Sequence, residues 1–238
     1  GPLIPSMAAA AVILRRLRDL HPAPGARAAT EALELADYQS LFAGRAIVHG
    51  CREVTAETAR QPLYHRMLGT AWAGLPEPVR AMHDLSGDKR VAGRVEVERG
   101  TGLTARLVAA LIGFPSTGHD VPVEVTFRVR DGVETWQRRF SGRSFSSTQQ
   151  AGRGRSEGLL EERFGPVRVG LALVLDGDRL RLVVRCWSLL GLPMPLALAP
   201  GGEAWETAAE GRFRFHVEIR HPWAGLIVRY RGWLEPEG

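Results

Sequence analysis

Apolar and polar residues alternate through most of the chain, most clearly in the stretch from Val167 to Trp187. Every second residue of 167–175 is apolar, and the following Asp176-Gly177 pair is typical of a two-residue hairpin turn. After the turn, the apolar face continues with Leu180, Leu182, Val184 and Cys186. A two-residue turn sets Leu173 opposite Leu180, so the pattern and the register both predict an antiparallel hairpin with one buried face.

A second hairpin is predicted around Asp131-Gly132, after the strictly alternating stretch from Val121 to Val129. Its core face carries Phe127 among valines. The return strand must obey the same register, which turns Glu134, Trp136, Arg138 and Phe140 toward the core and Arg139 toward water. Arg138 is therefore a charged residue that the pattern places on an apolar face.

A third hairpin is predicted at the C-terminal end, where a loop over His221–Ala224 follows an apolar row. The row consists of Phe213, Phe215, Val217 and Ile219. The loop sets Phe215 opposite Tyr230. With a first long strand over Val91–Arg99, a strand over 143–148 and another over 159–164, the chain has enough antiparallel strands to close around one small ligand. We expect an α+β fold that is mostly antiparallel β, a curled sheet or lipocalin-like barrel of about eight or nine strands.

Helix signals are short and lie between or before the strands. Pro62 and Pro76 each stand where a helix can begin. Thr101 is expected to cap a helix between the first two long strands, with Leu103, Leu107 and Leu111 on one stripe and Gly113 at its end. Residues 7–61 are interpreted as an N-terminal helical extension, with an amphipathic helix over 7–20 and a second helix after Thr30, and residues 62–238 as the β-barrel domain. Residues 1–6 resemble an expression scar.

The turn after the first long strand reads Gly100-Thr-Gly-Leu-Thr-Ala105, which matches a dinucleotide-binding fingerprint. That fingerprint requires a second, parallel strand buried on both faces. Residues 121–129 instead alternate strictly and turn back into a hairpin, so the sequence favours an ordinary turn here. We expect no nucleotide or other cofactor.

The segment 189–200 contains three prolines among leucines, which a regular strand does not tolerate. We expect an apolar lid or rim segment that crosses one end of the sheet.

The formal net charge of +5 comes almost wholly from arginine, because Lys89 is the only lysine among the 31 basic residues. The arginines are spread singly along strands, and the one local cluster, Arg153-Gly-Arg155, lies in a loop without interleaved aromatic residues, so the sequence does not indicate nucleic-acid binding. The apolar run 8–14 is too short to span a bilayer, which predicts a cytoplasmic protein without integral membrane association. Cys51 and Cys186 are expected to be free thiols.

Arg138 needs a partner, because an isolated guanidinium in an apolar core is prohibitively costly. One interpretation is a structural ion pair with Glu134 or Glu162. The other is that the sheet curls around a cavity in which Arg138 holds a carboxylate or enolate oxygen of an apolar guest.

Candidate catalytic groups are few. The seven histidines show none of the spacings typical of metal sites, and we expect no metal. His83-Asp84 is interpreted as a helix end or loop. Glu206, close to Glu203, Glu210 and Trp205, can serve as an acid or base if the rim folds over the cavity, whereas the alternative is solvated loop charges.

Several short segments together carry a resemblance to a known family: Leu63-Tyr64, Leu75-Pro76, Val79-Arg80, His83, Gly113-Phe114-Pro115, Trp136-Gln-Arg138-Arg-Phe140, Trp205-Glu206 and Tyr230-Arg-Gly-Trp233-Leu234. In these segments the chain resembles an uncharacterised bacterial domain family that is found C-terminal to saccharopine-dehydrogenase-like reductases. The resemblance covers roughly Leu63 to Leu234 and transfers no catalytic residue. It implies a stand-alone version of a module that travels with enzymes acting on lipid-like metabolites, with a reductase as a possible partner.

Two functions follow from these observations. In the first, the barrel binds a largely apolar, oxygen-bearing small molecule and acts as a cofactor-free cyclase, isomerase or lyase of lipid-like or polyketide-like metabolism, with Arg138 and Glu206 as catalytic groups. Its expected ligand-binding residues are Phe127, Glu134, Trp136, Phe140, Trp205, Phe213, Phe215 and Tyr230. In the second, the barrel is a non-catalytic module that binds a lipid or a partner reductase.

Overall fold

The computed structural model describes residues 9–11, 13–14, 18 and 61–237. Residues 9–11 and 13–14 are helical, and the rest of the expected N-terminal helix, the helix after Thr30 and Cys51 lie outside the described residues. The described strands are β1 (Lys89–Arg99), β2 (Gly118–Arg130), β3 (Val133–Phe140), β4 (Arg143–Ala151), β5 (Leu160–Phe164), β6 (Val167–Asp176), β7 (Arg179–Leu189), β8 (Leu192–Pro193), β9 (Ala204–Ala209), β10 (Arg212–His221) and β11 (Gly225–Pro236).

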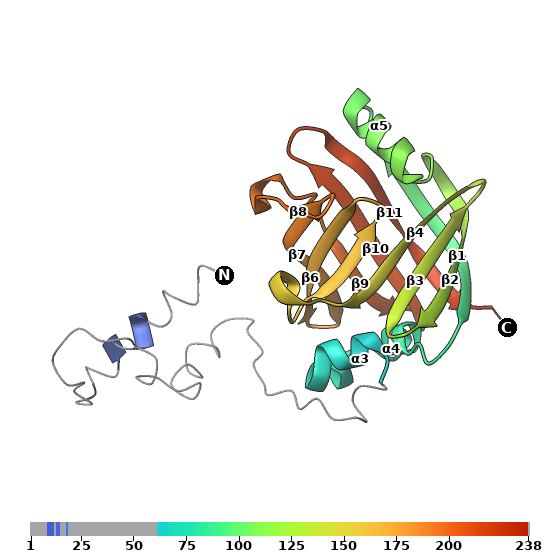
Figure 1. The fold of residues 1–238 in the computed structure, drawn as a ribbon. Coiled ribbons are helices and arrows are strands. Elements are labelled where there is room, and N and C mark those ends of the chain that lie inside the picture. Colours follow the sequence, from blue (N-terminus) through green and yellow to red (C-terminus); the bar gives the residue numbers. More distant parts are fainter. Residues whose placement is uncertain (1–8, 12, 15–17, 19–60, 238) are drawn as a thin grey trace. The chain divides into compact units, whose positions relative to one another are not determined.

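These strands form a closed antiparallel barrel (Figure 1). Their order is β6-β5-β4-β3-β2-β1-β11-β10-β9-β7-β8, and a further pairing of β6 with β7 closes the wall. The two-residue strand β8 only extends the end of β7, so ten strands build the barrel. The predicted barrel is confirmed, with one or two more strands than the pattern indicated.

The register of the β2–β3 hairpin is the predicted one. Phe127 pairs with Trp136, Val125 with Arg138 and Val123 with Phe140. Trp136 and Phe140 are buried and Arg139 is exposed. The inward position of Arg138 is thus confirmed.

The other two hairpins keep the predicted faces but shift in register. Leu173 pairs with Leu182 rather than Leu180, because the turn residues are Gly177 and Asp178. Phe215 pairs with Gly232 rather than Tyr230. Both shifts equal two residues, and a shift of two leaves side chains on their original face as long as the ladder is regular. Each ladder also has one irregularity, between Gly170 and Leu171 in the first and between Ile219 and Arg220 in the second, beyond which the faces change.

Cys186 is a correction to the predicted pattern. The β6–β7 ladder has an irregularity between Gly170 and Leu171, so Cys186 pairs with Gly170 and Trp187 pairs with the buried Val169. An extra residue in one strand moves all later side chains to the other face. Trp187 therefore belongs to the core face and Cys186 does not. The Cys186 thiol is free.

Helices α3 (Leu63–Leu68) and α4 (Glu77–His83), joined by the 3-10 helix η3 (Gly69–Gly74), lie across the end of the barrel at which β1 begins (Figure 1). Each α-helix follows directly on its predicted proline, Pro62 or Pro76. Their buried residues join the barrel core, among them Tyr64 and His83. This end of the barrel is called the α3 end below.

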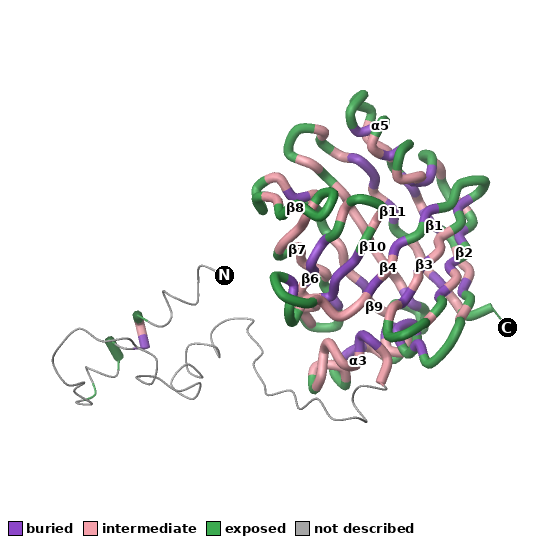
Figure 2. Tube along the Cα trace, viewed as in Figure 1, coloured by how far each residue is buried: buried purple, intermediate pink, exposed green. Residues whose placement is uncertain are grey.

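The opposite end carries α5 (Leu103–Ile112), between β1 and β2, and is called the α5 end (Figure 1). The helix is confirmed and ends at the left-handed Gly113, but its N-cap is Gly102 rather than Thr101. Ala105 and Ala109 are buried, whereas the three leucines of the stripe are exposed. Figure 2 shows both buried and exposed stretches along α5. None of the described helices is long and apolar enough to cross a membrane.

The segment after β7 turns back on the rim at the α5 end. Met194 donates a backbone hydrogen bond to Trp187, whose indole Nε1 donates to the carbonyl of Pro195 at 2.8 Å. The 3-10 helix η5 (Leu196–Leu198) follows. The prolines thus produce a rim segment.

Candidate functional site

The barrel interior contains polar side chains from six different elements, gathered around aromatic rings. We call them the inner polar cluster: Tyr64, His83, Glu134, Arg138, Ser147, Gln149, Glu162 and Glu206. Ser147 and Gln149 come from β4, Glu162 from β5 and Glu206 from β9. All of them except Arg138 are buried, and its side chain is only 13% exposed.

Trp136 lies at the centre of this arrangement. Its ring centroid is 4.7 Å from that of Phe127 and 5.6 Å from that of His83. The guanidinium carbon of Arg138 lies 5.0 Å from the same ring. The indole Nε1 donates a hydrogen bond to Glu134 Oε2 at 3.0 Å. The Trp136 side chain therefore contacts His83, Arg138 and Glu134.

Arg138 reaches its counter-charge through a serine. Its Nη1 donates to Ser147 Oγ at 2.9 Å, and Ser147 Oγ donates to Glu162 Oε1 at 2.7 Å. The direct distance from Arg138 Nη2 to Glu162 Oε1 is 3.7 Å, longer than a hydrogen bond. Glu162 is thus the ion-pair partner of Arg138, and the guanidinium keeps further N–H groups that are not committed to it.

His83 forms the closest polar contact of the cluster. Its Nε2 lies 2.5 Å from Glu206 Oε2. With the carboxylate accepting, Nε2 carries the proton, and a neutral ring then has its lone pair at Nδ1. Tyr64 stacks on the imidazole with ring centroids 3.7 Å apart, and its hydroxyl donates to Gln149 Oε1 at 3.0 Å. This is the geometry of an oriented base, because the carboxylate and the stacked ring hold the imidazole in place.

Two buried polar atoms of the cluster have no hydrogen-bond partner among the described residues, His83 Nδ1 and Glu134 Oε1. Burial raises the pKa of the Glu134 carboxyl, although the Trp136 hydrogen bond and the nearby His83 act in the opposite direction. Burial and the charges of Glu206, Glu162 and Glu134 raise the pKa of Tyr64 well above its ordinary value. Neighbouring groups with perturbed pKa values are often found at functional sites.

The interior is packed unevenly. In β1 and β2, Val91 and Phe127 are fully buried, whereas Val121 and Val129 are only partly buried. Strands β6, β7 and β10 each have buried inward residues as well as partly buried ones. The partly buried ones include Leu173, Leu182, Val184, Phe215 and Val217.

Most of the predicted site residues are brought together in this interior. Phe127, Glu134, Trp136, Phe140, Phe213 and Tyr230 are buried, and Phe215 is partly buried. Glu206 is in the barrel wall and 8% exposed, so the interpretation as a solvated loop charge is wrong. Burial raises the pKa of Tyr230 to about 12.

Trp205 departs from the expectation and is not part of the interior. It precedes the inward Glu206 in β9, so its side chain lies on the opposite face of the strand. There its ring stacks on the His216 ring, with the two ring centroids 5.3 Å apart. The Arg179 guanidinium carbon lies 4.8 Å from the centroid of the Trp205 ring. It lines a surface groove together with Arg214 and Trp233.

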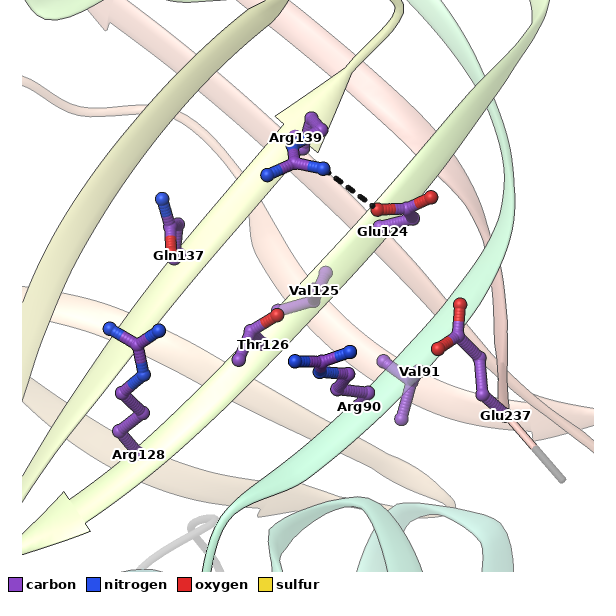
Figure 3. A pocket seen from close by; sticks show the side chains of 9 residues that line it. All are labelled: Arg90, Val91, Glu124, Val125, Thr126, Arg128, Gln137, Arg139 and Glu237. Atoms are coloured by element: carbon purple, nitrogen blue, oxygen red, sulfur yellow. Dashed lines mark ion pairs between the residues drawn. The ribbon is translucent and has the colours of Figure 1, made fainter.

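A second groove on the outer wall of β1–β3 is lined by charged and polar residues (Figure 3). They include Arg90, Arg128 and Gln137, and Arg139 pairs with Glu124 at 3.6 Å across it. These are the outward positions of the alternating strands. The groove does not reach the inner polar cluster, and nothing in it resembles an oriented base.

Sequence reasoning missed His83, Tyr64, Ser147 and Gln149. Continuing the register from β3 would have found the last two, since Trp136 pairs with Ser147 and Glu134 with Gln149. His83 and Tyr64 had no comparable signal, because a helix laid across a barrel end is positioned by tertiary packing alone. The described residues contain no group of three His, Cys, Asp or Glu that could hold a metal ion. Strands β1 and β2 are antiparallel, unlike the parallel pair of a dinucleotide fold.

The family model for a domain of unknown function, DUF4166, matches residues 75–234, from just before α4 to near the end of β11. The chain belongs to the DUF4166 family. This match covers seven members of the inner polar cluster and omits Tyr64, which precedes it. No curated protein matches the chain. The association of DUF4166 domains with reductases stays a prediction.

Proposed function

We propose that this DUF4166 barrel binds a largely apolar, oxygen-bearing small molecule and converts it by proton transfer, without metal or nucleotide. The observation that carries the proposal is the His83–Glu206 pair inside an aromatic-lined barrel, with Nδ1 buried and unpartnered. A base of this kind needs an acidic proton to act on, and a buried, unpaired nitrogen is costly to maintain without such a role.

The partly buried inward residues of β6, β7 and β10 favour an apolar guest. Leu173, Leu182, Val184, Phe215 and Val217 have no polar side-chain group, so none of them competes for a polar group of the ligand. Ligand pockets in proteins combine apolar walls with a few convergent polar groups in this way. The inner polar cluster supplies those groups on the facing wall.

In the proposed reaction, His83 Nδ1 takes a proton from a carbon next to a carbonyl of the guest. The electron pair moves to the carbonyl oxygen, where an N–H of Arg138 that is free of Ser147 stabilises the negative charge. The imidazolium then returns the proton to the other face of the same carbon or to another carbon, so the net step is an isomerisation. Glu206 stabilises the imidazolium and acts as a positioning residue.

A fluorescent polyene fatty acid serves as the binding probe, and two variants of β3 separate the interior from the outer wall. We expect the probe to raise the melting temperature of the wild type and of Arg139→Met. Loss of a charged hydrogen bond predicts binding to Arg138→Met that is about tenfold weaker or more. Equal binding by both variants would contradict an interior site. A wild type that the probe does not stabilise, with a destabilised Arg138→Met, would favour the structural ion pair and the non-catalytic module.

Proton transfer itself is measured by deuterium uptake from heavy water into a long-chain ketone, followed by mass spectrometry. We expect uptake faster than in buffer with the wild type, and uptake at the buffer rate with His83→Gln. Glu206→Gln is the companion variant, because it keeps the imidazole and removes the carboxylate that orients it and stabilises the imidazolium, so uptake should be slower than with the wild type. Uptake that is unchanged in folded His83→Gln protein would reject the assignment of the base.

A further inference from the structure

The exposed apolar residues of the barrel are concentrated at one of its two ends. Between residues 61 and 237, every large apolar side chain that is exposed belongs to α5 or to the strand ends and connections at the α5 end. These residues are Leu103, Leu107, Leu111, Leu189, Leu190, Leu192, Leu196 and Trp223. We call them the apolar rim. They come from α5, from the rim segment after β7 and from the β10–β11 turn. Three separate connections at this end therefore each carry exposed large apolar side chains.

The most apolar face of helix α5 is exposed to solvent and does not pack against the barrel. Leu103, Leu107 and Leu111 are 83%, 62% and 78% exposed, whereas Ala105 and Ala109 are fully buried. An amphipathic helix of a globular protein normally turns its large apolar side chains to the core. The inverted arrangement of α5 indicates that its leucines serve a contact outside this fold.

Three arginines lie together at the α5 end. Arg99 interacts electrostatically with both Arg143 and Arg106. At the α3 end the connections carry charges of both signs, among them Asp131, Glu157 and Arg155. No described carboxylate forms an ion pair with any of these three arginines, and the buried Arg99 Nε has no hydrogen-bond partner among the described residues.

We propose that the α5 end docks on the surface of a bilayer that contains anionic phospholipid, with the apolar rim inserted at the level of the headgroups. Leucines in the acyl boundary, a tryptophan at the interface and arginines beside them are the residue types that interfacial helices use. A second copy of this chain is disfavoured as the occupant, because a twofold contact through this end would bring the Arg99–Arg106–Arg143 groups of both copies together.

Vesicle flotation with the full chain tests the proposal. We expect binding to phosphatidylcholine vesicles that contain phosphatidylglycerol, and weaker binding to phosphatidylcholine alone. Replacing the three helix leucines together, Leu103→Asn, Leu107→Asn and Leu111→Asn, should weaken binding by at least tenfold, because each partly inserted leucine contributes roughly a few-fold to tenfold. The leucines are exposed, so the melting temperature should not fall.

A charge reversal separates the electrostatic contribution to vesicle binding from the contribution of the apolar residues. Arg106→Glu should reduce binding to the anionic vesicles, and Arg128→Glu, an exposed arginine near the α3 end, should not. Because all variants keep residues 7–20 intact, the expected N-terminal amphipathic helix cannot account for a difference between them.

Three results would overturn the proposal. Binding of the triple variant that equals the wild type would mean that the leucines do not face lipid, as when another segment of the chain covers them. A wild-type dimer in light scattering that the triple variant loses would assign the rim to a second copy. A wild type that floats with neither vesicle would leave a protein partner as the occupant.

Discussion

His83, at the C-terminal end of α4, lies 2.5 Å from Glu206 of β9, 123 positions further along the chain. The contact ties the helices at the α3 end to the barrel wall and at the same time orients the imidazole. A structural and a catalytic consequence of one pair can be separated experimentally, because stability and deuterium uptake are measured independently.

Glu206→Gln should lower the free energy of unfolding by about 1–3 kcal/mol, because it weakens a buried, charge-assisted hydrogen bond. Urea unfolding followed by circular dichroism measures the change. Glu203→Gln is the matched control, since Glu203 is exposed just before the same strand, and it should stay within about 0.5 kcal/mol of the wild type. Equal effects of the two variants would show that the His83–Glu206 contact does not stabilise the fold.

The raised pKa of the buried Glu134 carboxyl predicts that the free energy of unfolding depends on pH. Burial raises its pKa above the ordinary value of 4.5, so the folded state holds the proton more tightly than the unfolded chain. Stability contributed by Glu134 is therefore fully present below pH 4.5 and is lost as the pH rises through the folded-state pKa. Glu134→Gln cannot ionise and keeps an acceptor for Trp136 Nε1.

The measurement is urea unfolding of the wild type and Glu134→Gln between about pH 4 and pH 8. We expect the variant to gain on the wild type as the pH rises. Glu124→Gln, on the exposed outer face of β2, should show no such trend. The free energy of unfolding of Glu134→Gln relative to the wild type should rise with pH. A relative free energy that stays constant or falls as the pH rises would contradict the raised pKa of Glu134.

Gly170 is required by the irregularity that moves Cys186 off the core face. A Cβ at this position would lie 2.6 Å from Cys186 Sγ and 3.0 Å from Leu159 Cδ1. Gly170→Ala should therefore cost about 1–3 kcal/mol in urea unfolding. The cost should be smaller when Cys186→Ala is also present, because the sulfur is then gone. Gly87→Ala is the control, since its Cβ would meet nothing within 4 Å. Additive single and double variants would show that Gly170 and Cys186 do not touch.

The site was predictable where it lies on a strand whose register is specified. Arg138 and Glu134 face inward because Asp131-Gly132 sets the β2–β3 pairing and every second residue follows. Glu206 was recognised as a candidate, but the pattern around Trp205 left open whether it lay in a loop. Its partner could not be found, because neither His83 nor its neighbours carry a periodic signal that says against which strand α4 packs.

The sequence by itself determined the antiparallel hairpins, the starts of α3 and α4 at their prolines and the inward arginine. All of these depend on local backbone chemistry and on a side-chain period of two, which act over a few residues. Closure of the wall by β6 and β7, the strand irregularity at Gly170, the His83–Glu206 pair and the exposure of the α5 leucines were decided only by the tertiary structure. Each depends on how distant elements pack, and an amphipathic stripe specifies that one face is apolar but not which surface covers it.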